Sequence, residues 1–425
     1  MSAELKAEQA ESNRFAIHKL GPLGAEPEFS EDARMVQESV HRYAEQVMRP
    51  IGIKLDRMSP EEVIAPKSPY WEAREKFLEL GFGIEALLGL PPAERAKTMC
   101  ILFEELGWGD SGLAISFGAG MLASLMSHLM GTDFLRQCAP DSTLGCWAIT
   151  EPDHGSDILD ASGMIFNTQG NYGRPNCIAT LTGDGVIITG QKSAWVSNGT
   201  IAGVCLLYCA ADSGSGPDPR RGCVVIVPLD AKGVTRGKPL DKFGQRALNQ
   251  GEIYFDNVKL SKNHVLAGPD QYQDAVYAVH TFANALMGTV FTGCARAAFE
   301  LAHGYAHERK QGGLPIIRHQ SVAYRLFHMF RKVEAARALT HRVVHYNFSS
   351  PHPSLHAAMT AKITATQTSF EVASDALQIF CGNGLTRDYP IEKILRDARA
   401  SLIEDGCNEV LAIKGGYYLI DPDLL

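Results

Sequence analysis

The chain has 425 residues and a formal net charge of −8, with 40 lysines and arginines against 48 aspartates and glutamates. This length predicts about two to four domains, and the 45% hydrophobic content argues against a disordered chain. The acidic balance, without a block of Lys and Arg, argues against a general nucleic-acid binder. No run of roughly 18 apolar residues predicts a membrane span.

The first twenty residues carry Glu4, Glu8 and Glu11 before any apolar run, unlike a secretory signal or an acid-poor transit peptide. The 10 cysteines are scattered without a Cys-x-x-Cys spacing. We therefore expect reduced thiols in a cytoplasmic protein, with neither a disulfide framework nor a zinc site. The histidines form no His-Glu-x-x-His motif, and no metal site is predicted.

Up to about residue 145, apolar residues recur at helical spacing, as at Val36, Val40 and Tyr43. This pattern predicts an N-terminal helical domain over residues 30–145. The segment Gly118-Ala-Gly120 imitates a dinucleotide fingerprint, but its flanks are helical and it lacks the strand that such a site needs. There is also no P-loop and no Gly-x-Ser-x-Gly elbow.

From Gly145 to about Gly268 the pattern changes to short β-branched runs separated by Gly, Asp and Pro. The clearest runs cover residues 185–188, 204–208, 223–227 and 253–255. Residues 213–219, with the sequence Ser-Gly-Ser-Gly-Pro-Asp-Pro, are expected to form an exposed loop between two of them. The pattern predicts a middle domain over residues 146–265, built as an antiparallel sheet or barrel.

Helical spacing returns from about Gln271 and predicts a C-terminal helical domain over residues 266–425. One face of a long helix is indicated by Val322, Leu326, Met329, Val333 and Ala336. Residues 357–380, rich in Ala and Thr, predict another helix. Hydrophobic periodicity alone therefore predicts only an enzyme-sized protein in which a helical region, a strand region and a second helical region follow one another.

Four segments carry a more specific signal. They are Trp147–Asp157 (WAITEPDHGSD), Gly190–Gly199 (GQKSAWVSNG), Glu308–Gln320, and the stretch from Gln378 to Gly406 with its Gly-Asn-Gly, Tyr-Pro-Ile-Glu-Lys and Ile-Glu-Asp-Gly parts. In order and spacing they resemble the acyl-CoA dehydrogenase family of flavoproteins, over residues 30–415. The resemblance implies an N-terminal helical domain, a middle antiparallel β domain and a C-terminal four-helix-bundle domain, with FAD as cofactor.

The resemblance also assigns residues to the flavin. Ile149, Thr150 and Ser156 would bind the flavin at the end of a strand, and Trp195 would cover the isoalloxazine ring with its indole. Ser197 replaces the Thr that usually bonds near the reactive flavin nitrogen, and either hydroxyl can serve. Taken one at a time, these residues could equally be turn residues and a core Trp.

The far end of FAD is implied to be held by a second subunit. Arg309 and Gln320 resemble residues that reach across a subunit boundary to the pyrophosphate and adenine, and a guanidinium fork suits phosphate. Gln378 and Gly382 resemble contacts on the adenosine side. Such a shared site implies a homodimer or a homotetramer built as a dimer of dimers, although Arg309 could also be a solvated helix charge.

The catalytic base aligns to Asp405, where the family usually has a Glu before a Gly-Thr pair. Its side chain is one methylene shorter, roughly 1.5 Å less reach, and a misplacement of about 1 Å can cost a hundredfold in rate. A turn or cap role for Asp405, and Glu404 as the base, are the alternatives. The other position at which relatives carry the base aligns to Ala283, which cannot serve.

The residues expected around the substrate are Ser156, Asn284, Asp405 and Gly406. Asn284 stands where an Arg is frequent. Cys407 replaces the usual Thr near the flavin and is counted among the cofactor-binding residues. The segment 81–95 is contracted, which would either open the pocket to a bulky acyl group or be a neutral deletion.

The resemblance implies FAD-dependent α,β-dehydrogenation of an acyl-CoA thioester to a 2,3-enoyl-CoA. Asp405 would remove the α-proton, FAD would take the β-hydride, and an electron-transfer flavoprotein would accept the electrons. Asp as base is known in relatives acting on cyclic acyl-CoA thioesters and in nitroalkane oxidases. A substrate with a bulky or cyclic acyl group is therefore compatible with Asp at this position. The rivals are a nitroalkane-oxidase-like flavin oxidase, a non-redox lyase or desulfinase on the same fold, and a non-catalytic subunit.

Overall fold

The structure, a computed structural model, describes residues 30–160 and 173–421. Helices form its first part, and their bounds are α2 Glu31–Tyr43, α3 Arg49–Asp56, α4 Pro60–Ile64, α5 Pro69–Glu79, α6 Ile84–Gly89, α7 Pro92–Gly109, α8 Ser111–Met130 and α9 Asp133–Cys138. Polar side chains begin several of them: the Ser59 hydroxyl accepts the Glu62 N–H, and the Glu62 carboxylate accepts the Ser59 N–H in return.

Helix α8 is the most apolar of these helices. Among the described residues it alone is long and apolar enough to cross a membrane, but 72% of its apolar window is buried inside the protein. Its N-terminus is capped by Asp110, whose carboxylate accepts the Leu113 N–H at 2.9 Å. Gly118 and Gly120 lie within it, so the glycines that imitate a dinucleotide motif are helical. Burial on all sides is the mark of a core helix.

The middle part is a sheet that has eight strands within the described residues. Their bounds are β1 Gly145–Ala148, β2 Cys177–Leu181, β3 Gly185–Lys192, β4 Val204–Asp212, β5 Pro217–Pro228, β6 Val234–Arg236, β7 Ile253–Ser261 and β8 Val265–Ala267. The order is β6-β7-β3-β2-β4-β5-β8, with β1 on β4. The four strand runs predicted from sequence lie in β3, β4, β5 and β7.

Two predictions about this sheet are wrong in part. Strand β4 runs parallel to both β1 and β2, so the sheet is mixed and not purely antiparallel. Long connections lead from β1 to β2 and from β3 to β4, and parallel pairing requires such crossovers in place of hairpins. The loop expected over residues 213–219 is shorter, because Pro217 and Asp218 already pair with β4.

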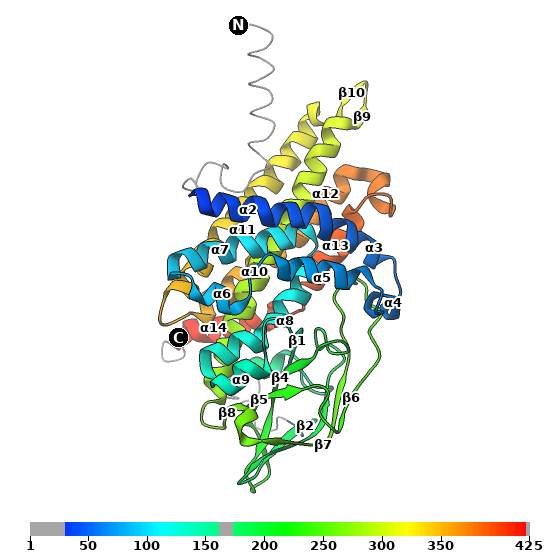
Figure 1. Cartoon of the computed structure of the whole chain (residues 1–425). Coiled ribbons are helices and arrows are strands. Elements are labelled where there is room, and N and C mark those ends of the chain that lie inside the picture. The colour runs from blue at the N-terminus through cyan, green and yellow to red at the C-terminus, as the bar shows by residue number, and fades with distance from the viewer. Residues whose placement is uncertain (1–29, 161–172, 422–425) are drawn as a thin grey trace.

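The C-terminal part is helical again. Its elements are α10 Tyr272–Glu308, α11 Gln320–Ser349, α12 Leu355–Phe380, α13 Ile391–Ala400 and α14 Asn408–Ile420, with the small hairpin β9 Lys310–Gln311 and β10 Leu314–Pro315 between α10 and α11. Leu326, Met329, Val333 and Ala336 are buried along one face of α11, as the spacing predicts. Figure 1 shows the sheet at one end of the molecule and the β9–β10 hairpin at the opposite end.

Buried ion pairs join the N-terminal helices to the C-terminal ones. Glu104 of α7 accepts hydrogen bonds from Arg296 of α10 at 2.8 Å and from Arg337 of α11 at 3.0 Å. The imidazole of His341 lies 2.9 Å from its other oxygen. Glu104 has no exposed surface, and the two guanidinium groups hold its pKa well below the usual range despite burial. This network fixes α7, α10 and α11 against one another.

Candidate active site

The loop between α13 and α14 carries Asp405 in an unusual backbone conformation. Asp405 has φ 49° and Gly406 has φ 96°, both in the left-handed region. A Cβ on Gly406 would lie 2.7 Å from Leu159 Cδ1, and its φ of 96° would strain any other residue. Asp tolerates this region better than most residues. The sequence Asp-Gly therefore permits a sharp turn that presents the Asp405 carboxylate from a loop packed against the β domain.

Three elements hold this loop. Asn284 of α10 donates from Nδ2 to the Asp405 carbonyl at 3.3 Å, and Lys362 of α12 donates to the Gly406 carbonyl at 2.8 Å. The Ser156 hydroxyl accepts the Cys407 N–H at 3.1 Å. Ser156, Asn284, Asp405 and Gly406, which the resemblance groups around the substrate, are thus close together. Asn284 itself is fully buried, and its hydrogen bond supports the loop from the side of α10.

Burial sets the proton affinity of the loop's two carboxyl groups. It raises the pKa of Asp405 to about 6, against the opposing effect of the nearby Lys362 ammonium. Burial also raises the pKa of Glu404 to about 7, while Lys242 and a hydrogen bond from Gln245 lower it. A carboxylate whose pKa lies near the working pH is suited to general-base catalysis.

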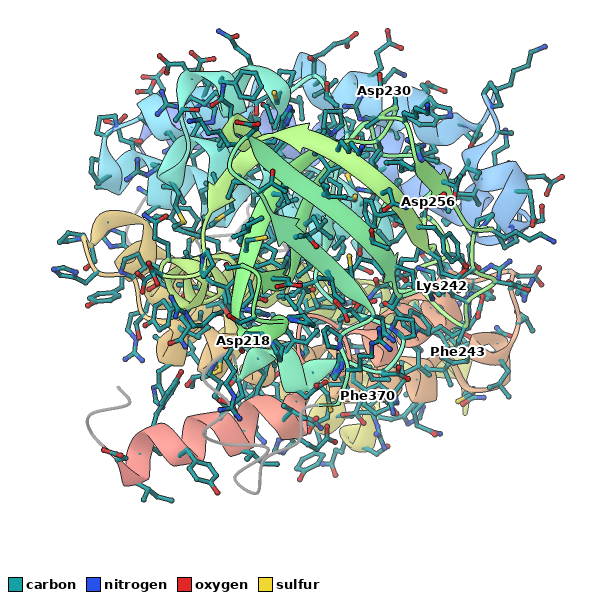
Figure 2. The ribbon with its side chains drawn as sticks, turned by 90° about the horizontal axis from the view of Figure 1, so that it is seen from below. Asp218, Asp230, Lys242, Phe243, Asp256 and Phe370 are labelled. Carbon is teal, nitrogen blue, oxygen red and sulfur yellow. The ribbon has the colours of Figure 1, made fainter. Side chains whose placement is uncertain are left out.

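The Glu404 side chain is engaged on the other side of the loop. Gln245 donates from Nε2 to Glu404 Oε2 at 2.7 Å, and Lys242 comes from the same 237–252 segment. Arg396 of α13 donates to the Phe243 carbonyl at 2.9 Å, which ties this segment to the helices. Figure 2 shows Lys242 and Phe243 beside the sheet, on the side of the C-terminal helices. The contact with Gln245 turns the Glu404 side chain toward the 237–252 segment.

The strand-end residues assigned to the flavin lie over a buried ion pair. Lys192 donates to the Ile149 carbonyl at 3.0 Å and to Glu151 at 2.7 Å, and neither charged side chain is more than slightly exposed. The hydroxyls of Thr150 and Ser193 lie 2.7 Å apart. Because Lys192 binds the backbone carbonyl of Ile149 and the side chain of Glu151, the residues on both sides of Thr150 are held in place at the end of β1.

Trp195 presents an exposed indole beside these hydroxyls. Its side chain is 62% exposed, which is unusual for the largest apolar residue. Its carbonyl accepts Gln250 Nε2 at 3.2 Å, and the same amide lies 3.4 Å from Ser197 Oγ. An uncovered aromatic face with hydroxyls nearby fits a planar flavin ring with polar edges, so the residues present match the chemistry of FAD.

The residues assigned to the far end of FAD form a second group. Arg309 follows α10, Gln320 begins α11, Gln378 is near the end of α12, and Gly382 lies in the turn Cys381–Leu385. All four are exposed. The ends of α10 and α12 are joined by stacked rings of Tyr305 and Phe380 with centroids 4.1 Å apart, beside the β9–β10 hairpin. Figure 1 places this tip opposite the sheet. Within one chain, the residues assigned to the flavin ring and those assigned to the far end of FAD therefore lie at opposite ends of the molecule.

Several supporting residues were missed from sequence. They are Lys192, Ser193, Gln245 and Lys362, whose side chains form hydrogen bonds with the loops that carry the predicted site residues. Histidine pairs four residues apart were also overlooked, such as His303 and His307, whose ring centroids are 4.7 Å apart. Within the described ranges, however, no group of three His, Cys, Asp or Glu could hold a metal ion.

Comparison with known proteins agrees with this geometry. The model of the acyl-CoA dehydrogenase middle domain matches residues 146–258, and that of the acyl-CoA dehydrogenase C-terminal domain matches residues 277–414. Together they cover more than half of the chain. The chain belongs to the acyl-CoA dehydrogenase family, whose members are FAD flavoprotein oxidoreductases.

Individual relatives span nearly the whole chain. Benzylmalonyl-CoA dehydrogenase of Aromatoleum aromaticum is 28% identical, covering 91% of this chain and 97% of its own. The 3-(aryl)acrylate reductase of Clostridium sporogenes is 27% identical, covering 90% and 97%. The structure of butyryl-CoA dehydrogenase from Megasphaera elsdenii has a TM-score of 0.80 at 23% identity, covering 93% and 100%, and has the same fold.

Proposed function

We propose that this chain catalyses α,β-dehydrogenation of an acyl-CoA thioester to a 2,3-enoyl-CoA, with Asp405 as the base. The observation that carries the proposal is the Asp405 carboxyl group, with its pKa raised to about 6, on a loop anchored by three separate elements. At neutral pH this carboxylate is ionised and ready to accept a proton, yet it binds that proton more tightly than an ordinary aspartate does.

The α-hydrogen of a thioester is only weakly acidic, so its removal needs two kinds of help. Asp405 takes the α-proton, and its own backbone N–H donates to the thioester oxygen, where negative charge develops. In this proposal the backbone and the side chain of one residue act on the same reacting group, and the left-handed turn at Asp405 and Gly406 would allow both to face it. When bound, FAD supplies the acceptor for the β-hydride.

The two separate groups of flavin residues support a shared cofactor site. Thr150, Trp195 and Ser197 would bind the isoalloxazine end, with Ile149, Ser156 and Cys407 beside them. Arg309, Gln320, Gln378 and Gly382 would bind the pyrophosphate and adenosine of the FAD held mainly by a second copy. Because one chain keeps these groups at opposite ends, the site is completed in a homodimer or in a dimer of dimers.

A ring-bearing acyl group is the substrate class that we propose. The name of one relative, benzylmalonyl-CoA dehydrogenase, and that of another, 3-(aryl)acrylate reductase, both specify substrates with an aromatic ring. A base shortened from Glu to Asp leaves more room beside the α-carbon. The electrons would leave through an electron-transfer flavoprotein.

The test is an anaerobic titration of the purified flavoprotein with straight-chain, branched and ring-bearing acyl-CoAs, followed by the visible flavin spectrum. Bleaching by an aryl-substituted acyl-CoA at lower concentration than by a straight-chain one supports the proposal. A flavin that none of them bleaches would contradict it and favour the lyase or oxidase alternatives. Oxygen consumption without an added acceptor would contradict the electron-transfer flavoprotein.

A further inference from the structure

Lys362 is a fully buried lysine directly behind the Asp405 loop. It lies on α12 with no exposed surface, among Ala361, Ala365 and other small buried residues. Its ammonium donates to the Gly406 carbonyl and to Asn408 Oδ1, each at 2.8 Å. A buried ammonium is costly unless its bonds are satisfied, and both of these acceptors lie just after Asp405.

The surroundings of Lys362 are acidic. The titratable groups that face it are Asp405, Glu404, Cys407 and Glu409. From α10 the neighbouring side chain is the neutral amide of Asn284, and Lys242 faces Glu404 from the 237–252 segment. Lys362 is the only cation whose charge acts on Asp405 among the groups that shift it. Burial lowers the pKa of Lys362 to about 8, so it remains charged at neutral pH.

We propose that Lys362 is a positioning residue for the base: its ammonium fixes the 405–408 turn through Gly406 and Asn408, and its charge keeps the Asp405 carboxylate ionised. This inference rests on the proposed function in one respect, that Asp405 is the base. The hydrogen bonds of the Lys362 ammonium go to the loop, at Gly406 and Asn408. It acts through the loop, which explains why a helix of small residues contains a single buried lysine at this level.

Two substitutions separate the two parts of this role. Lys362→Met removes both charge and donors, whereas Lys362→Gln removes the charge and keeps an amide donor. The control is Lys332→Met, which removes a lysine that is paired with Glu371 at 2.7 Å on the outer side of the bundle. All three are compared with wild type as FAD-loaded proteins of verified flavin content.

The readout is the rate of flavin reduction by a saturating acyl-CoA as a function of pH. In Lys362→Met the apparent pKa of the base should rise by about one unit, because the nearby Lys362 ammonium lowers the pKa of the Asp405 carboxyl in the wild type. The plateau rate should also fall about tenfold or more, because the turn loosens. Lys362→Gln should show the same pKa shift with a smaller loss of plateau rate, and Lys332→Met neither change.

A substrate-free measurement keeps this inference separate from the proposed function. The infrared band of the protonated Asp405 carboxyl, assigned by its loss in Asp405→Asn, is titrated in wild type and in Lys362→Gln. An upward shift supports the role of Lys362 even if no acyl-CoA bleaches the wild-type flavin, which would overturn the proposed function alone. An unchanged midpoint in the infrared, or an unchanged pH profile and plateau in Lys362→Met, would overturn the role of Lys362. If Lys362→Met does not fold, the pH profile and the infrared titration of Lys362→Gln test the role of Lys362.

Discussion

Asn284 Nδ2 donates to the main-chain carbonyl of Asp405, with 3.3 Å between the two atoms, and also to the His280 carbonyl at 3.0 Å. This one side chain therefore links helix α10 to the loop of the proposed base. Asn284 Oδ1 is buried and has no hydrogen-bond partner among the described residues. An amide kept buried with one atom unsatisfied indicates that its donor end is important at this position.

The first prediction uses Asn284 to distinguish support of the loop from contact with CoA. In Asn284→Ala we expect kcat to fall about tenfold with little change in KM, because the base is less well positioned. A residue that contacted CoA would instead raise KM at unchanged kcat. Steady-state kinetics with one acyl-CoA decides, and His345→Ala on the outer side of α11 is the control for a side-chain truncation in the helical domain.

The second prediction concerns the base itself. Asp405→Ala should keep FAD bound and lose flavin bleaching by about 10² to 10⁴-fold, which is the usual contribution of a general base. Glu404→Gln, which keeps the size of the neighbouring carboxyl group and its contact with Gln245, should retain most of the rate. Stopped-flow reduction of both variants is the measurement. Equal losses in the two variants, or full activity in Asp405→Ala, would contradict the assignment of Asp405.

How far the sequence could predict this site is seen from particular residues. β-Branched runs bounded by Gly and Asp were enough for strands such as β3 and β4, since their pattern is local. The parallel pairing of β4 with β1 and β2 was missed, because it depends on long connections whose course no local pattern specifies. Lys362 was missed because a lone lysine in a helix is usually solvated, and its acceptor Gly406 is 44 residues away.

The third prediction is a pH dependence of stability. Burial raises the pKa of Asp405 to about 6 and that of Glu404 to about 7, above the 3.8 and 4.5 that are usual for these carboxyl groups in water. The folded protein thus binds these protons more tightly than the unfolded chain, so their contribution to stability is present at low pH and is lost as pH rises through about 4 to 7.

This pH dependence is tested with neutral variants. The double variant Asp405→Asn, Glu404→Gln should be more stable than wild type at pH 8, and the difference should shrink toward pH 4. Urea unfolding at several pH values, followed by circular dichroism, measures it. A difference that is constant with pH, or that grows on acidification, would show that burial does not raise these two pKa values.

The fourth prediction concerns the buried ion network at Glu104. Glu104→Gln removes the charge that pairs with Arg296 and Arg337, while Glu105 still pairs with Arg296 and Glu334 with Arg337. Removing one partner of a buried pair costs about 3–5 kcal/mol in unfolding free energy, and the carboxylates that remain place the expected loss at the lower end of that range. Glu72→Gln, at an exposed pair with Lys76, is the matched control and should leave the midpoint of urea unfolding unchanged. Similar midpoints for the two variants would contradict the structural role of the network.

The fifth prediction tests whether FAD is shared between copies. Arg309 is exposed and lies between α10 and the β9–β10 hairpin, at the end of the molecule opposite the sheet, so in the proposed site it would bind an FAD held mainly by a partner. Arg309→Ala should therefore weaken FAD binding about tenfold or more, because it removes a charge-assisted contact to phosphate. Arg342→Ala, an exposed arginine farther along α11, should retain its flavin.

Mixing distinguishes a shared site from a local effect on the chain that carries Arg309→Ala. A dimer of this variant with Trp195→Ala contains one site with both defects and one site with neither, if Arg309 acts on the partner's flavin. If Arg309 acts within its own chain, each site has one defect. Recovery of about half the wild-type flavin content or bleaching in the mixed dimers is therefore expected from the shared site. Mixed dimers whose two sites remain equally impaired would contradict it.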